Sequence, residues 1–102
     1  MIVTKTEWQI KMDFKKAMAA VNNLRKIANK LDDNNDDFGG VINLIDNNWD
    51  GENSEKFIGK GRTIQGKISE TSAGIRKTAD AIEDIAKRLR DAELNAIRIA
   101  RD

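Results

Sequence analysis

A heptad repeat of apolar residues runs through the first half of the chain. Counting from Ile10 in alternate steps of four and three residues gives twelve positions, and eleven of them are apolar. A register kept for so long is typical of the seam of a coiled-coil helix. We therefore predict one helix over about residues 7–48. Its seam positions are Ile10, Phe14, Ala17, Val21, Leu24, Ala28, Leu31, Asn35, Phe38, Ile42, Ile45 and Trp49.

A second register begins at Phe57 and continues to Ile99. Ten of its thirteen positions are apolar and the other three are glycine or threonine, which predicts a second helix over about residues 53–99. The positions are Phe57, Gly61, Ile64, Ile68, Thr71, Ile75, Thr78, Ile82, Ile85, Leu89, Ala92, Ala96 and Ile99.

The stretch Asp32–Gly40 is the weakest part of the first predicted helix, because Asp, Asn and Gly are poor helix formers. One interpretation is a loop between two shorter helices. The register is kept across the stretch, however, since Phe38 and Ile42 fall where Leu31 predicts them. We favour a continuous, weakened helix.

The two registers are separated by Trp49-Asp50-Gly51. Gly51 can adopt the positive φ that ends a helix, and Asp50 or Asn53 can cap the helix that follows. The sequence therefore predicts an all-α fold, an antiparallel helical hairpin that forms a single domain over 1–102, with its turn at about 49–52. Facing residue numbers are then expected to sum to about 102.

Apolar residues also flank the two seams, so the apolar stripe is wider than one helix contact needs. A lone hairpin buries one stripe per helix, and the extra width predicts a second contact, most simply dimerisation into a four-helix bundle. The flanking residues are Ala20, Ile27, Val41, Ile58, Ala79, Ala86 and Ala100. The expected interface and bundle residues are Phe14, Val21, Leu24, Ile27, Leu31, Phe38, Ile42, Ile45, Phe57, Ile64, Ile68, Ile75, Ile82, Ile85 and Leu89.

The residue inventory argues against an enzyme. Histidine, cysteine and tyrosine are all absent, which removes the usual general base, the best metal ligand and two nucleophiles. The segment from Asp46 to Gly51 matches the first half of a calcium-binding loop, but Phe57 stands where the bidentate glutamate is required. We therefore predict no catalytic residue, no metal and no cofactor.

Charge is unevenly distributed although the net charge is only +1. Eight acidic and no basic residues lie between Asp32 and Glu55, and the remainder has a basic surplus. Basic residues near the C-terminus alternate with acidic ones, for example Arg88 and Arg90 with Asp84 and Asp91, which argues against nucleic-acid binding. No apolar run approaches transmembrane length, and Met1–Asp13 lacks the apolar core of a secretory leader.

The segment Asn48-Trp49-Asp50-Gly51, followed by Ser54 and Phe57 at mid-chain, resembles the WXG family. These are the Esx-like, early-secreted-antigen-type proteins of type VII secretion. Trp49 and Gly51 match the signature pair of the family, and Phe57 matches its following core aromatic residue. The resemblance implies a leaderless hairpin that dimerises and is exported from Gram-positive bacteria by a membrane ATPase.

The resemblance leaves two functions open. The first is a type VII secretion substrate or co-secreted partner, cytoplasmic before export and then secreted, that acts as a homodimer or as a heterodimer with another helical hairpin or a toxin's N-terminal region. The second is a cytoplasmic adaptor or chaperone that targets a larger LXG-type toxin and is not itself exported. Family export signals commonly pair a tyrosine with an acidic residue four positions later, and the nearest analogue here is Leu89 with Glu93.

Overall fold

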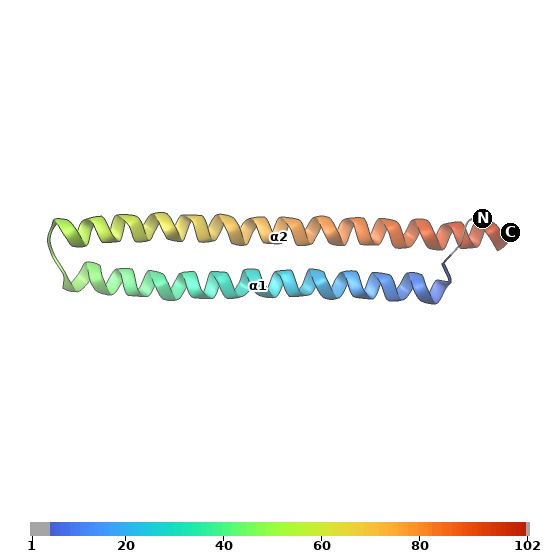
Figure 1. Cartoon of the computed structure of the whole chain (residues 1–102), viewed down its shortest axis with the longest axis horizontal. Helices are drawn as coiled ribbons and strands as arrows, with labels where there is room; N and C mark the ends of the chain where they lie inside the picture. Colours follow the sequence, from blue (N-terminus) through green and yellow to red (C-terminus); the bar gives the residue numbers. More distant parts are fainter. Residues whose placement is uncertain (1–4, 102) are drawn as a thin grey trace. The chain divides into compact units, whose positions relative to one another are not determined.

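The computed structural model describes residues 5–101 and contains two α-helices in that range. Helix α1 spans Glu7–Asn48 and helix α2 spans Glu52–Arg101, with a short turn between them and no strand in the described range (Figure 1). The fold is all-α, a helical hairpin, as the heptad repeats predict. The chain divides into two compact units: a tip unit of Arg25–Arg76, and a terminal unit that takes α1 up to Leu24 and α2 from Lys77.

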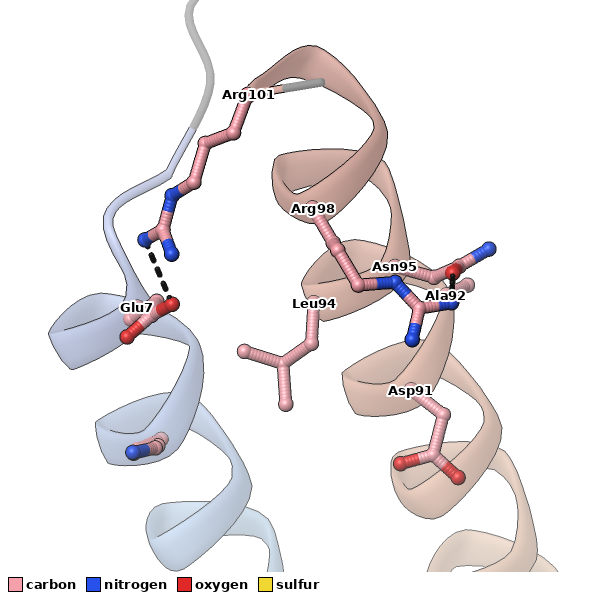
Figure 2. A pocket seen from close by; sticks show the side chains of 8 residues that line it. Glu7, Asp91, Ala92, Leu94, Asn95, Arg98 and Arg101 are labelled. Carbon is pink, nitrogen blue, oxygen red and sulfur yellow. Dashed lines mark hydrogen bonds and ion pairs between the residues drawn. The ribbon is translucent and has the colours of Figure 1, made fainter.

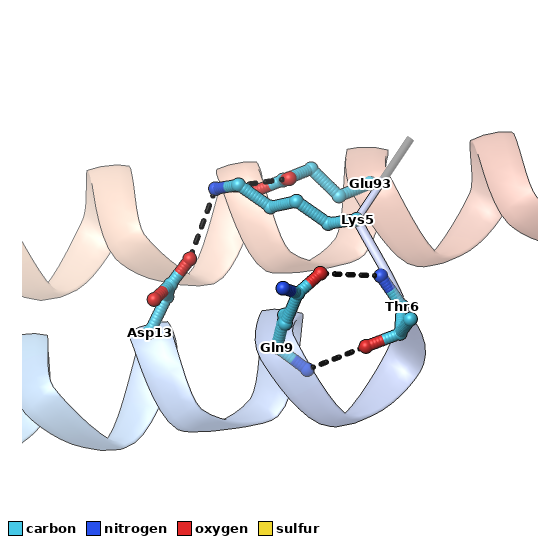
Figure 3. A network of polar contacts seen from close by, with 5 residues as sticks. All are labelled: Lys5, Thr6, Gln9, Asp13 and Glu93. Carbon is cyan, nitrogen blue, oxygen red and sulfur yellow. Dashed lines mark hydrogen bonds and ion pairs between the residues drawn. The ribbon is translucent and has the colours of Figure 1, made fainter. Parts of the chain in front are cut away.

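A capping box starts α1. The Thr6 hydroxyl accepts a hydrogen bond from the Gln9 N–H at 3.1 Å, and the Gln9 side-chain carbonyl accepts one from the Thr6 N–H at 3.0 Å (Figure 3). This reciprocal pair satisfies two backbone donors that the first turn of a helix leaves without partners. Glu7 adds a negative charge at the positive end of the helix dipole.

Helix α1 continues through Asp32–Gly40 without a break, as the unbroken register indicates. Asn35, Gly39 and Ile42 are buried within this stretch or just after it, because they face α2. Tertiary packing of one face supplies most of the stability of a protein helix, so it can hold a segment of poor intrinsic propensity in helical form.

The turn depends on Gly51, whose φ is 118°. The Gly51 carbonyl accepts the Glu55 N–H at 3.2 Å and the Ser54 hydroxyl at 2.8 Å, which fixes the first turn of α2. The side-chain cap expected from Asp50 or Asn53 is not formed in the described residues: the Gly51 carbonyl accepts the first backbone hydrogen bond of α2, and the Ser54 hydroxyl, which is buried, donates to that carbonyl. At the end of α1, the Asn48 amide donates to the Leu44 carbonyl at 2.7 Å.

Apolar and charged contacts both hold the terminal unit together. Ile10, Val21 and Ala79 are buried in its seam, and the Arg90 guanidinium lies 4.3 Å from the centre of the Phe14 ring. Beyond the seam, Lys5 bridges two carboxylates on different helices, Asp13 at 3.0 Å and Glu93 at 3.3 Å (Figure 3). The hydrogen bonds to Asp13 and then Glu93 raise the pKa of Lys5 above its usual 10.5.

Most of the fully buried residues of the tip unit are small or polar. Ala28, Asn35 and Ile42 of α1 are buried, and on α2 the buried residues are Ser54, Gly61 and Ser72. Ile42 contacts Gly61, and the Ser72 hydroxyl donates to the Ala28 carbonyl at 3.2 Å. The numbers in each such pair sum to about 102, as expected for antiparallel helices joined by this turn.

From Phe57 to Ile85 the seam of α2 differs from the sequence prediction at every second position, and beyond it the predicted positions Leu89, Ala92, Ala96 and Ile99 are all exposed. Gly61, Ile68, Ile75 and Ile82 face α1 as predicted. Five other predicted seam residues are exposed: Phe57, Ile64, Thr71, Thr78 and Ile85. In each case the next residue in the chain is buried or partly buried in its place, namely Ile58, Gln65, Ser72, Ala79 and Ala86. Compared with the prediction, α2 is rotated about its own axis, so that smaller or more polar side chains face α1.

Candidate interaction surface

Large apolar side chains remain exposed on the tip unit. Leu44 is 62% exposed and Trp49 68%, while Phe57, Ile27, Val41 and Ile64 are each about half exposed. Single exposed apolar residues are ordinary on a protein surface, so what matters is whether these side chains gather on one side.

The polar contacts between α1 and α2 show which sides of the two helices meet. Arg76 donates to Asp32 at 2.6 Å and to Asn29 at 2.8 Å, and Arg62 donates to Asn43 at 2.8 Å. Each of these five residues immediately follows a seam residue in the chain. We call the side that they form the polar edge of the tip unit.

The exposed apolar residues lie on the opposite side. Since successive residues of an α-helix are about 100° apart, residues just before and just after a seam position fall on opposite sides of it. Five exposed residues immediately precede a seam residue: Ile27, Val41, Leu44, Phe57 and Ile64. Because the polar contacts bring residues that follow seam positions together on one side of the two helices, these five side chains gather on the other side. We call that side the apolar edge.

Charged residues border the apolar edge. Lys30, Asp37, Lys60 and Lys67 also precede seam residues and are exposed. An apolar centre with a polar rim is the usual composition of a protein–protein interface. The apolar edge thus has the chemistry of a surface that packs against another helix.

The polar edge satisfies its own charges. The pKa of Asp32 is lowered from its usual 3.8, first by a hydrogen bond from the Ser72 hydroxyl and then by the Arg76 guanidinium. The Ser72 hydroxyl also lies 3.2 Å from the Ala28 carbonyl, and its single proton can serve only one acceptor. We regard the 2.6 Å Arg76 contact as the one that holds the carboxylate. Because both ionic side chains are partly exposed, this pair stabilises the fold only modestly.

The expected interface residues fall into three groups. Val21 and Ile42 are fully buried between the two helices of the chain itself. Ile27, Phe57, Ile64, Ile85 and Leu89 are exposed. The remainder are partly buried in the seams: Phe14, Leu24, Leu31, Phe38, Ile45, Ile68, Ile75 and Ile82.

The aromatic residues around the turn lie outside the core. The backbone carbonyl of Trp49 lies 3.4 Å from the Ser54 hydroxyl, but its indole is mostly exposed. Phe57, expected as a core aromatic residue, is also exposed because α2 presents Ile58 to the seam in its place. Within the signature segment, Gly51 and Ser54 shape the turn, and the two rings are available for contact.

In the terminal unit, Leu89 and Glu93, the nearest analogue of a family export signal, differ in their surroundings. Leu89 is half exposed. Glu93 is paired with Lys5, which reaches it from the segment that precedes α1 (Figure 3). The carboxylate of this pair is therefore already engaged within the chain.

One hollow of the terminal unit has a volume of about 710 Å³, and Figure 2 shows its lining. Arg101 is paired with Glu7 at 2.7 Å, and Arg98 donates to Asn95 at 2.6 Å. Among residues 5–101, no three carboxylates lie close enough together to hold a metal ion. The remaining lining residues are Lys11, Asp91, Ala92 and Leu94.

Sequence reasoning missed two large exposed residues. Leu44 precedes the seam residue Ile45 and extends the apolar edge, so its position in the heptad was a usable signal. Trp8 is 70% exposed beside Ile97 and Ala100 in the terminal unit, and no periodicity marks it.

A family comparison gives this arrangement its context. The model of the WXG100 family, "Proteins of 100 residues with WXG", matches residues 9–94, a range that includes Trp49 and Gly51. The chain belongs to the WXG100 family. It is therefore a small helical protein associated with type VII secretion. No significant match was found among curated proteins or solved structures. In the described range, neither helix has an apolar stretch sufficient to span a membrane.

Proposed function

We propose that this protein is a substrate or co-secreted partner of a type VII secretion system and acts by packing its apolar edge against a second helical hairpin. The product of that packing is a four-helix bundle, and no catalytic step is involved. The observation that carries the proposal is the apolar edge itself, where Ile27, Val41, Leu44, Phe57 and Ile64 are exposed.

The energetics favour association. Full burial of a large apolar side chain stabilises by about 1.5–3 kcal/mol, and the five residues of the apolar edge are still about half exposed or more. Covering them therefore offers several kcal/mol, against which the loss of rotational and translational freedom must be set. A hairpin with its larger side chains outside gains most from a partner that presents a similar apolar stripe.

The mass of the protein in solution tests this proposal. We expect the wild-type chain to have the mass of a dimer at micromolar concentration by light scattering. The double variant Val41→Asp/Phe57→Asp should be a helical monomer, because each charge would have to be buried in the interface. The matched control Asn47→Asp/Thr63→Asp adds the same charges at exposed positions outside both edges and should remain dimeric.

A monomeric wild-type chain would rule out the homodimer. The proposal would then require a heterodimer with another hairpin protein or with the helical N-terminal region of a toxin. Co-expression with a candidate partner, such as the helical N-terminal region of an LXG-type toxin, should then yield a one-to-one complex that the Val41→Asp/Phe57→Asp variant fails to form.

The alternative function is a cytoplasmic adaptor or chaperone for a larger LXG-type toxin. Two observations favour it: the chain contains no tyrosine, and Glu93, the acidic residue of the nearest export-signal analogue, is paired with Lys5. The two functions differ in where the protein accumulates. A substrate appears in the culture supernatant of a Gram-positive host only when the secretion ATPase is active. An adaptor stays in the cells under both conditions.

A further inference from the structure

The seam of the tip unit contains a buried polar layer built around Asn35. The Asn35 amide donates to the Gln65 carbonyl at 3.1 Å and lies 3.2 Å from the Ser69 hydroxyl, and the Gln65 amide donates to the Asn35 carbonyl at 3.3 Å. The side-chain oxygen of Asn35 is buried and has no hydrogen-bond partner. A buried acceptor without a partner lowers the stability of the packing around it.

The backbone around this layer is also weak. Asp32–Gly40 carries four aspartates, three of them without an ion pair, and ends in two adjacent glycines. Gly61 and Gly66 lie on the facing stretch of α2, and each glycine in a helix costs about 1 kcal/mol relative to alanine. Weak helix propensity and a polar seam therefore coincide on both helices of the tip unit.

The polar layer is not needed to set the alignment of α1 with α2. A buried asparagine in a coiled coil of separate chains can fix the alignment of the helices at a cost in stability. In this hairpin the turn at Gly51 already joins α1 to α2 and sets their direction and alignment. What remains is the loss of stability at this level of the seam.

We propose that residues 32–69 form a section that opens locally in the free chain, with the polar layer as its weak point. Four of the five residues of the apolar edge lie within this section: Val41, Leu44, Phe57 and Ile64. Opening separates the two helix faces that bring these side chains together, so the interaction surface exists only while the section is closed. A partner that covers the apolar edge then also holds the section closed. This last step rests on the proposed function, whereas the opening itself does not.

Amide hydrogen exchange of the full-length protein tests the opening. We expect amides in 33–41 and 61–69 to exchange through an opening that depends weakly on added denaturant, as local openings do, while the most protected amides follow global unfolding. Asn35→Leu removes the unpaired acceptor and should slow exchange in both segments at least tenfold. Asn47→Leu makes the same chemical change at an exposed position of α1 and should leave these rates unchanged.

A second variant strengthens the same section without touching the seam. Nothing lies within 4 Å of a Cβ added at Gly40, so Gly40→Ala should slow exchange in 33–41 by raising helix propensity alone. The proposal is overturned if 33–41 and 61–69 exchange only by global unfolding, or if both variants change all protected amides equally. All exchange measurements are made in the Val41→Asp/Phe57→Asp background, which is expected to be monomeric, so the result is independent of whether the wild-type chain forms a dimer.

Discussion

Gly61 sets how closely the two helices approach in the tip unit. A Cβ at this position would lie 2.8 Å from Cδ1 and 3.1 Å from Cγ1 of Ile42, which is fully buried. The glycine is therefore needed for packing, even though it weakens α2 as a helix.

Gly61→Ala should accordingly destabilise the fold. Overpacking against Ile42 costs about 1–3 kcal/mol, and the gain in helix propensity returns about 1 kcal/mol, so we expect a net loss of about 1 kcal/mol. Gly59→Ala, where nothing lies within 4 Å of the added Cβ, should instead stabilise by up to about 1 kcal/mol. Urea unfolding of both variants checks the prediction, and equal shifts for the two would contradict it.

Asp32 gives stability a pH dependence of known sign. Its pKa in the folded protein is lowered below 3.8, so its ion pair with Arg76 contributes fully above that pH. The contribution is lost as pH falls through the folded-state pKa. Asp32→Asn should thus be less stable than wild type near neutral pH, and the difference should shrink well below pH 3.8.

The measurement is the urea midpoint of both proteins across that pH range. Asp33→Asn is the matched control, because Asp33 is exposed and makes no ion pair. A gap between Asp32→Asn and wild type that is unchanged at low pH would show that the carboxylate does not contribute through its charge.

At the scale of elements, the turn depends on a backbone conformation. Gly51 has a φ of 118°, a region that residues with a Cβ rarely adopt. The Trp-x-Gly spacing predicted a turn, and Gly51 supplies it through its φ and through the carbonyl that starts α2.

We expect Gly51→Ala to cost about 1–3 kcal/mol of folding free energy through backbone strain, although no atom lies within 4 Å of the added Cβ. Gly74→Ala is the control, since it lies inside α2 with equal space and should be neutral or stabilising. Thermal unfolding followed by circular dichroism separates the two. A neutral Gly51→Ala would mean that the turn relaxes to another conformation without cost.

The two helices differ in how well their burial could be predicted. On α1, every predicted seam position from Ile10 to Ile45 is at least partly buried, because only one row of apolar residues fits a heptad there. On α2, the prediction followed the row that contains Phe57, Ile64 and Ile85, which is the more apolar of two rows one residue apart. Helix periodicity cannot separate such rows, since both give a continuous stripe.

At the scale of the whole molecule, association should be linked to stability. If the apolar edge is covered in a dimer, folding and dimerisation share one equilibrium, and the melting temperature rises with protein concentration. A tenfold higher concentration should add about 1.4 kcal/mol to the stability of the dimer.

This linkage can be measured by melting the wild type at several concentrations together with Val41→Asp/Phe57→Asp. The variant should melt at the same temperature at every concentration, because it has no partner to lose. If light scattering reports a dimer but the melting temperature of the wild type does not change with protein concentration, dimerisation adds nothing to the stability of the fold.

The sequence by itself determined the helical hairpin, the seam of α1, the place of the turn and the resemblance to the WXG family. These properties follow from local periodicity, from the glycine at position 51 and from a short motif, all of which are features of the linear sequence. It could not determine the rotation of α2. That was decided by close packing in the tertiary structure, where Ile42 requires the space above Gly61 and small residues such as Ser72 and Ala79 fit between the helices. The larger side chains were thereby left on the outside, where only a partner can cover them.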